Sequence, residues 1–224
     1  MGPAAKTRSP RHPTSCQHDD MSDEHAIDPV DTRNRADLTT AVAAGARPEW
    51  LMFWGHQSQR DGSLGPGVLS QWWPGHPFTV DGVTYATAEH WMMAGKARMF
   101  DDTKTLARIL AAPSAAEAKK LGRQVRDFDD AAWRDGRFEL VVAGNVAKFG
   151  GHDDLRRYLL STGRRVLVEA SPLDRIWGIG LGADNERAER PAEWRGENLL
   201  GFALMEARAR LAADSAATTT GASA

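Results

Sequence analysis

The spacing of apolar positions predicts a mainly helical chain with one clear hairpin. Two short alternating runs, Phe78–Val80 and Val83–Tyr85, are joined by Asp81-Gly82, a dipeptide that suits a two-residue type I′ turn. The second run leads directly into Thr87, a residue type that is common at helix N-termini. We therefore expect a β-hairpin that is followed at once by a helix beginning near Thr87.

Further helices and one strand are predicted downstream, from capping residues, from apolar positions three or four residues apart and from glycine or proline at the ends. The expected helices cover Asp102–Leu110, Ser114–Leu121, a longer one capped by Asp129 or Asp130 that runs to Phe149, one starting at Asp153, and one capped by Asn198; the expected strand is Val166–Val168. A long loop from Ser171 to Gly196 separates this strand from the last helix, and loops of such length are often functional. The pattern predicts an α+β fold, a helix-rich single domain with a few short strands.

The two ends of the chain show little periodicity. Residues 1–46 are rich in Pro, Ser, Asp, Arg and His, and residues 213–224 are mostly Ala, Thr, Ser and Gly. Such compositions bury too little apolar surface to fold by themselves. We therefore expect a disordered N-terminal tail, one folded domain at 47–212 and a flexible C-terminal tail, with translation starting at Met1 or at Met21.

Composition narrows the class of protein. With 224 residues, 42% hydrophobic content and 8 Trp, the chain can bury one substantial core. It has no apolar run of about 18 residues and no signal-peptide pattern, so we expect a cytoplasmic protein without a membrane partner. Cys16 is the single cysteine, which excludes a disulfide framework. A net charge of −2 without a dense Lys/Arg block does not favour nonspecific binding to nucleic acid, but a nucleotide-sized ligand fits.

The helix after the hairpin contains the most informative polar pair. Glu89 and Lys96 are seven residues apart, about two helical turns, so they share a stripe with Met93 and Phe100. Burying a carboxylate and an amine is costly unless they are paired or used in chemistry. We therefore interpret this helix as the wall of an active site. The alternative is a structural ion pair, or a lysine whose amine reaches solvent.

Several familiar site patterns do not occur. The glycines at 178, 180 and 182 fit neither a dinucleotide-binding nor a P-loop pattern, the histidines lack zinc spacing, and no Gly-x-Ser-x-Gly elbow is present. What remains is the Glu/Lys pair, a loop carboxylate at Asp174 and many tryptophans. Carboxylates suit the cleavage of a glycosidic bond, because they stabilise the developing positive charge and transfer protons. A desolvated lysine can also form a Schiff base with a ring-opened ribose.

Ordered motifs extend from about Trp50 to Leu211. They are Phe53-Trp54, Leu69-Ser-Gln-Trp-Trp73 before Pro77-Phe-Thr-Val-Asp-Gly82, Thr87-Ala-Glu-His90 with Lys96, Gly122-Arg123, Trp133, Asn145 to Phe149, Asp174 to Gly178, and Asn198-Leu-Leu-Gly201-Phe-Ala-Leu-Met205. On these motifs the chain resembles the NADAR family of YbiA-like N-glycosidases. It departs from that family at Gln71 and Trp72, where many relatives carry Asn and Phe.

The resemblance implies a helix-rich fold and cleavage of N-glycosidic bonds. The bond would lie in phosphorylated ribosylamine intermediates of riboflavin synthesis or in ADP-ribose attached to guanine, including guanine in a nucleic acid. It also implies that Glu89 is the catalytic glutamate, that Lys96 captures the sugar covalently, and that Trp133 and Asp174 are further functional positions. No metal or redox cofactor is expected.

We therefore expect three catalytic residues and a set of residues that bind the substrate. Lys96 would form the adduct, Glu89 would transfer protons, and Asp174 would stabilise charge or position the sugar. The substrate would be held by Trp133 and Trp177, which stack on the base, by Arg123, which neutralises phosphate, and by Ser70 and Gln71. The alternatives are a noncatalytic sensor of ADP-ribose or an NAD derivative, and an interaction module without a small-molecule site.

Overall fold

A computed structural model describes residues 1–2 and 27–221 of the chain. Within them, seven α-helices surround two small pairs of strands. In chain order the elements are the 3-10 turn η1 (Pro29–Asp31), α1 (Arg35–Ala43), β1 (Trp50–Phe53), η2 (Pro66–Leu69), β2 (Phe78–Val80), β3 (Val83–Tyr85), α2 (Ala88–Met99), α3 (Thr103–Leu110), α4 (Ala115–Gly122), α5 (Asp130–Gly150), α6 (Asp153–Ser161), β4 (Val166–Glu169), η3 (Pro191–Glu193) and α7 (Leu199–Gly221). This confirms the predicted helix-rich α+β class.

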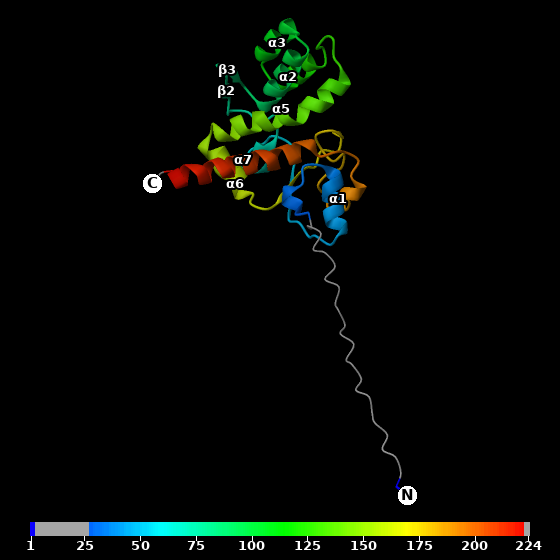
Figure 1. Ribbon diagram of the computed structural model, residues 1–224. Helices are drawn as coiled ribbons and strands as arrows, with labels where there is room; N and C mark the ends of the chain where they lie inside the picture. Colours follow the sequence, from blue (N-terminus) through cyan, green and yellow to red (C-terminus); the bar gives the residue numbers. More distant parts are fainter. Residues whose placement is uncertain (3–26, 222–224) are drawn as a thin grey trace.

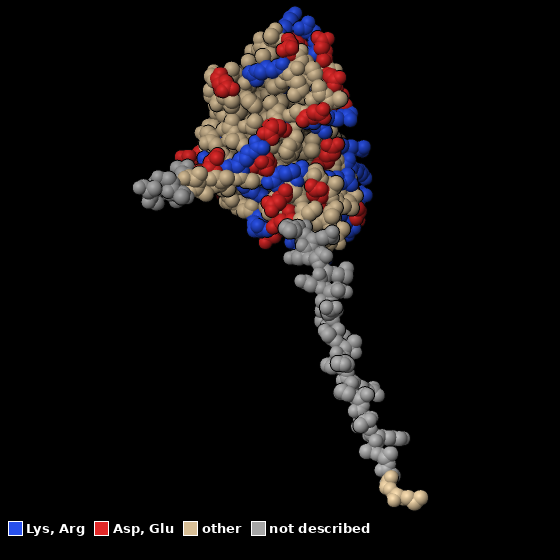
Figure 2. All heavy atoms as spheres, in the orientation of Figure 1, with Lys and Arg blue, Asp and Glu red and all other residues tan. Residues whose placement is uncertain are grey.

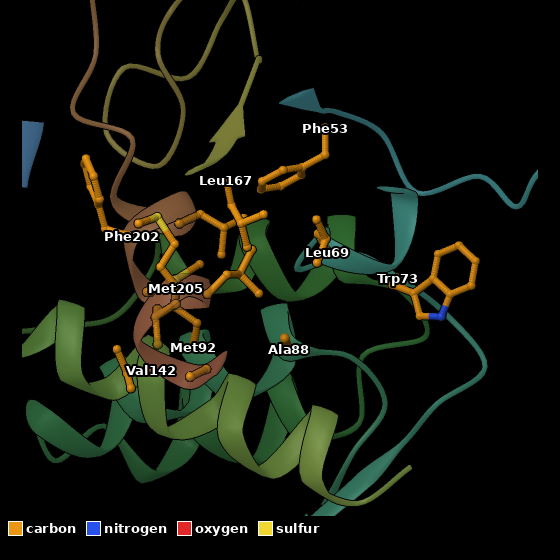
Figure 3. Packing of buried hydrophobic residues seen from close by; sticks show 14 of the residues in the cluster. Phe53, Leu69, Trp73, Ala88, Met92, Val142, Leu167, Phe202 and Met205 are labelled. Atoms are coloured by element: carbon orange, nitrogen blue, oxygen red, sulfur yellow. The ribbon is translucent and has the colours of Figure 1, made fainter. Parts of the chain in front are cut away.

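The two longest helices form the centre of the domain. Helices α5 and α7 lie side by side (Figure 1), with α2 packed on α5 and the strand β4 packed on α7. Helices α3 and α4 cover the other sides of α2. Figure 3 shows how the core collects side chains from distant segments of the chain, among them Phe53, Leu69, Met92, Val142, Leu167, Phe202 and Met205. The core therefore joins the hairpin half of the chain to its C-terminal helix.

The predicted hairpin is confirmed, with β2 and β3 paired antiparallel. Asp81 and Gly82 both have positive φ angles, 49° and 74°, as a type I′ turn requires. The strand at 166–168 is also confirmed, but its partner was not foreseen. Strand β1 pairs with β4 in parallel, with Phe53 opposite Glu169. Its four residues are too few to show a periodic pattern.

Local capping signals placed the helix starts correctly. The side chains of Thr87, Asp102, Ser114 and Asp129 each accept a hydrogen bond from the backbone N–H three residues further on. Each therefore satisfies an N–H group that the helix itself leaves without an acceptor.

Asn198 stands at the predicted start of α7, but it does not act as the predicted cap. Its Nδ2 donates to the Leu167 carbonyl at 3.0 Å, and its Oδ1 accepts from the Glu169 N–H at 2.9 Å. The first N–H groups of α7 instead donate to the carbonyls of Ile176 and Trp177. Asn198 therefore fastens the end of the long loop to β4.

The prediction of a disordered tail over residues 1–46 is wrong for residues 27–46. The structure has η1 and α1 there, and Leu38 is fully buried. Arg33 forms an ion pair with Glu206 at 2.7 Å, and Arg35 Nε donates to the Pro191 carbonyl at 2.8 Å. Helix α1 is ordered by docking on residues far along the chain, which a short local pattern does not reveal. Cys16 and the candidate start site Met21 lie outside the described residues.

The predicted flexible tail at 213–224 is wrong as far as residue 221, because α7 continues to Gly221. Alanine has the highest helix propensity, and extending an existing helix needs no new nucleation. Arg156 also donates to Ser215 Oγ at 2.8 Å, beyond the expected domain end.

The surface shows no block of one charge on the face in Figure 2, where acidic and basic side chains are interspersed. This agrees with the formal net charge of −2. Among the described residues, no helix has both the length and the apolar character needed to cross a membrane.

Candidate active site

Glu89 lines a narrow cavity where several separate segments of the chain meet. Counted separately, six segments form its walls: the segment after η2, α2, α4, the end of β4, the long loop and the start of α7. The lining residues are Ser70, Gln71, Trp72, Glu89, Met92, Lys119, Glu169, Asp174, Trp177 and Leu200. The volume of the cavity is about 40 Å³, far below the roughly 300–1,000 Å³ of typical small-molecule pockets. A sugar therefore enters only when surrounding side chains move.

The carboxyl group of Glu89 is buried and only partly hydrogen-bonded. The residue is 2% exposed, and its Oε2 accepts from Trp72 Nε1 at 3.2 Å. Its Oε1 has no hydrogen-bond partner among the described residues. Burial raises the pKa of Glu89 to about 7; Asp174 adds to the rise, while Lys119, Trp72 and Arg123 oppose it. A carboxyl group that is half-protonated near neutral pH is suited to proton transfer.

Asp174 and Trp177 lie in the long loop and line the same cavity. Asp174 Oδ1 accepts from the N–H groups of Ile176 and Trp177 at 2.9 and 2.8 Å. This local turn fixes the carboxylate and places Trp177 beside it. The structure thus brings Asp174 and Trp177 to Glu89, as the sequence-based hypothesis required.

Gln71 and Ser70 reach the cavity on a rigid segment. The carbonyl of Gln71 accepts from the Glu89 N–H at 2.9 Å, and Ser70 Oγ accepts from the Trp72 N–H at 3.1 Å. From the other side, Lys148 Nζ donates to the carbonyls of Val68 and Ser70 at 2.7 and 2.9 Å. Lys148 is almost fully buried, and burial lowers its pKa to about 7.

Lys96 is not among the residues that line this cavity. Its Nζ lies 3.9 Å from the centre of the Phe128 ring and 5.7 Å from that of Trp133. Burial lowers the pKa of Lys96, and Asp130 acts in the opposite direction. Seven residues of helix span about 10 Å, so Lys96 on α2 and Trp133 on α5 form a second cluster about two helical turns from Glu89. The structure does not bring them together with Glu89.

Arg123 lies at the exposed end of α4, also outside the lining, but near enough to lower the pKa of Glu89. The amine in the cavity wall is that of Lys119 instead, whose Nζ lies 5.8 Å from the centre of the Trp72 ring. Sequence reasoning missed Lys119, which has no distinguishing local pattern. It also missed Glu169, although an acidic residue that ends a buried strand before a functional loop was a usable signal.

A larger cavity of about 390 Å³ adjoins the first, and Trp72 lines both. His90 lines the larger one and anchors its wall, because its ring nitrogens pair with Thr87 Oγ1 at 2.8 Å and with the Ala112 carbonyl at 3.1 Å. This cavity has the size of a small-ligand site.

In chemical terms, the site combines a buried proton-transfer group with a fixed carboxylate, an amine and indole faces. Within the described residues, no group of three His, Cys, Asp or Glu side chains is placed to hold a metal ion. The arrangement can exchange a proton with a ligand and stabilise positive charge next to it.

Fold and site together define the class of protein: a helix-rich domain in which a buried carboxyl group, that of Glu89, lines a small polar cavity. Residues 52–212 match the NADAR domain family, and the chain belongs to this family. The resemblance inferred from the sequence motifs is therefore confirmed.

Named relatives agree with this assignment. The chain is 40% identical to N-glycosidase R617 of Acanthamoeba polyphaga mimivirus over 64% of its own length and 87% of the relative's. It is 33% identical to N-glycosidase YbiA of Escherichia coli over 61% of its own length and 76% of the relative's. A riboflavin biosynthesis protein of Vibrio vulnificus is 32% identical over 65% of this chain and 35% of that protein. The solution NMR structure of E. coli YbiA superimposes with a TM-score of 0.59 at 28% identity, over 76% of this chain and 89% of that one.

Proposed function

We propose that this protein is an N-glycosidase that cleaves the bond between ribose C1 and a base nitrogen. The observation that carries the proposal is Glu89, a buried carboxyl group with a free oxygen and a pKa of about 7, in one cavity with Asp174. Relatives named N-glycosidases support the reaction class. Binding alone would not require a buried group that titrates near neutral pH.

Glu89 would supply the proton for the leaving group. The C1–N bond breaks with its electron pair on the nitrogen, which takes the proton from Glu89 and leaves as the neutral base. The sugar carbon becomes positively charged, and the Asp174 carboxylate stabilises it. Water then adds to C1 and returns its proton to Glu89, so that the enzyme regains its starting state.

A covalent route through Lys96 gives the same products. The neutral Lys96 amine would attack C1 while the C1–N bond to the base breaks and the base nitrogen takes the proton of Glu89. The ring C1–O bond then opens to give the Schiff base, and a proton of the amine passes to the ring oxygen. Water adds to the Schiff-base carbon and returns a proton to Glu89, and expulsion of the amine leaves the free sugar and neutral Lys96. This route requires the Lys96 side chain to leave the Phe128 ring and turn toward Glu89, because Lys96 lies outside the cavity wall. The long, flexible stem of lysine makes such a movement feasible.

The proposed substrates carry a phosphorylated ribose. Lys119 and Arg123 provide positive charge near Glu89 for a phosphate. Trp177 and, beside Lys96, Trp133 on α5 offer ring faces for a base. A relative named for riboflavin biosynthesis favours a phosphorylated ribosylamine intermediate as substrate. ADP-ribosyl-guanine, free or in a nucleic acid, is the second substrate class.

Base release measured by chromatography tests the proposal. Wild-type protein is incubated with a 5-phosphoribosylamino-pyrimidine and with an oligonucleotide that carries ADP-ribosylated guanine. We expect release from at least one of them, and loss of that release in Glu89→Gln. Glu139→Gln, on the exposed face of α5, is the matched control and should behave as wild type. Tight binding of both compounds without release would favour a sensor and overturn the proposal.

A further inference from the structure

Glu169 brings a third carboxyl group to the cavity. Its backbone is fixed on both sides, because its N–H donates to Asn198 Oδ1 at 2.9 Å and its carbonyl accepts from the Ile179 N–H at 3.0 Å. The residue keeps some exposed surface, but its Oε2 is shielded from solvent and has no hydrogen-bond partner among the described residues. The fold therefore holds this oxygen at a place where the protein offers it no bond.

Among the described residues, the side chain of Gln71 also has unpaired polar atoms, two of them where Glu169 has one. It is 5% exposed and lines the same cavity, and both polar atoms of its side-chain amide lack a partner within the described part of the chain. Buried polar groups are normally hydrogen-bonded, and leaving them unpaired costs free energy. Unpaired atoms on two side chains around one small cavity indicate a place built for a polar ligand group.

The charge of Glu169 decides which ligand group fits. Burial raises its pKa to about 8, with Asp174 and Glu89 adding to the rise and Lys119 opposing it. Glu169 is therefore mainly protonated at neutral pH, and it offers both a donor and an acceptor. A sugar hydroxyl also donates and accepts. A phosphate would be repelled by Asp174, so it belongs on the side of Lys119.

We propose that Glu169 and Gln71 together bind the 2-hydroxyl group of the substrate's ribose, an assignment that rests on the proposed N-glycosidase function. The 2-hydroxyl is attached to the carbon next to C1, where Glu89 acts. The cavity of about 40 Å³ has room for one group of this size. Hydrogen bonds to the 2-hydroxyl commonly strengthen in the transition state of glycoside cleavage. Glu169 is thus a substrate-binding residue that selects ribosyl over deoxyribosyl compounds.

The binding of two simple sugars tests this proposal without any need for turnover. Ribose 5-phosphate and 2-deoxyribose 5-phosphate are titrated into the full-length protein by calorimetry at pH 6.5. We expect the wild type to prefer ribose 5-phosphate by roughly five- to tenfold. Glu169→Leu should reduce this ratio to about one, because it removes the donor and the acceptor. Glu169→Gln should keep most of it, and Glu139→Leu serves as the surface control.

A pH series separates binding from a merely structural role. As pH rises from 6.5 to 9, Glu169 ionises and loses its donor, so the wild-type preference should fall. In Glu169→Gln it should stay constant, since the amide does not titrate. Because this comparison needs only the wild type and Glu169→Gln, it tests the role of Glu169 even if Glu169→Leu does not fold.

The outcomes distinguish the two proposals. An unchanged sugar preference in Glu169→Leu, or the same pH profile in wild type and Glu169→Gln, overturns the role of Glu169 even if base release is observed. Equal binding or no binding of both sugars by the wild type also overturns it. The expected sugar ratios without any base release would overturn the glycosidase proposal alone.

Discussion

The backbone N–H of Glu89 donates a hydrogen bond of 2.9 Å to the backbone carbonyl of Gln71. Glu89 stands in the first turn of α2, where helix N–H groups have no acceptor within the helix. Gln71 therefore completes the helix terminus from outside. Both side chains line the same cavity and both have unpaired polar atoms. This bond couples the position of the proposed proton-transfer group, Glu89, to that of the proposed sugar-binding group, Gln71.

Replacing Glu89 by Gln should abolish most activity and leave the fold intact. The amide keeps the shape of the side chain but cannot give up a proton, so we expect kcat to fall by roughly 10²- to 10⁴-fold. Steady-state kinetics and circular dichroism of Glu89→Gln and Glu139→Gln provide the comparison. Wild-type turnover in Glu89→Gln would remove Glu89 from the mechanism.

The same variant should change how stability depends on pH. Because burial raises the folded-state pKa of Glu89 from 4.5 to about 7, its contribution to stability is fully present below pH 4.5 and is lost as pH rises through 7. Glu89→Gln cannot ionise. We expect it to match the wild type near pH 4.5 and to exceed its free energy of unfolding by on the order of 3 kcal/mol at pH 8. Urea titrations at both pH values measure this; a constant difference between the two proteins would contradict it.

Lys148 should act as a positioning residue for the segment that carries Ser70 and Gln71. Lys148→Met leaves the Val68 and Ser70 carbonyls without their donor, so we expect a loss of about 1–3 kcal/mol of stability and a higher KM. Lys104→Met, at an exposed position of α3, is the control. A KM equal to that of the wild type would show that the segment holds its position without Lys148.

Borohydride added during turnover should trap a sugar on Lys96 if the covalent route operates. Lys96→Arg should then abolish both the adduct and turnover, because a guanidinium stays protonated. Peptide mass mapping identifies the modified lysine. An adduct on Lys119, the amine in the cavity wall, would transfer the nucleophilic role to that residue. Normal turnover of Lys96→Arg would leave direct water attack as the mechanism.

Leu38 should contribute strongly to stability, contrary to the expectation that residues 1–46 form a disordered tail. It is fully buried in α1, so Leu38→Ala should cost about 2–5 kcal/mol. Leu173, which is 92% exposed, provides the matched control, and Leu173→Ala should leave the melting temperature almost unchanged. Equal melting temperatures for both variants would show that α1 adds no stability.

Local sequence signals determined much of this protein. The Asp81-Gly82 turn, the caps at Thr87 and Ser114, and the position of Glu89 in the first turn of α2 depend only on residues a few positions apart. Such features have the same physical cause in any context. From these local signals the sequence predicts the hairpin, the start of α2 and the place of Glu89, which forms one wall of the cavity.

Only the tertiary structure decided which groups face Glu89. Lys119 and Glu169 come from α4 and from the end of β4, and they reach the cavity because β1 pairs with β4 and because α4 packs on α2. Lys96 shows the opposite case. Helical spacing puts it on the same stripe as Glu89, but Phe128 and Trp133 supply its surroundings. The periodicity of a helix fixes the direction of a side chain, whereas the packing of distant segments determines its neighbours.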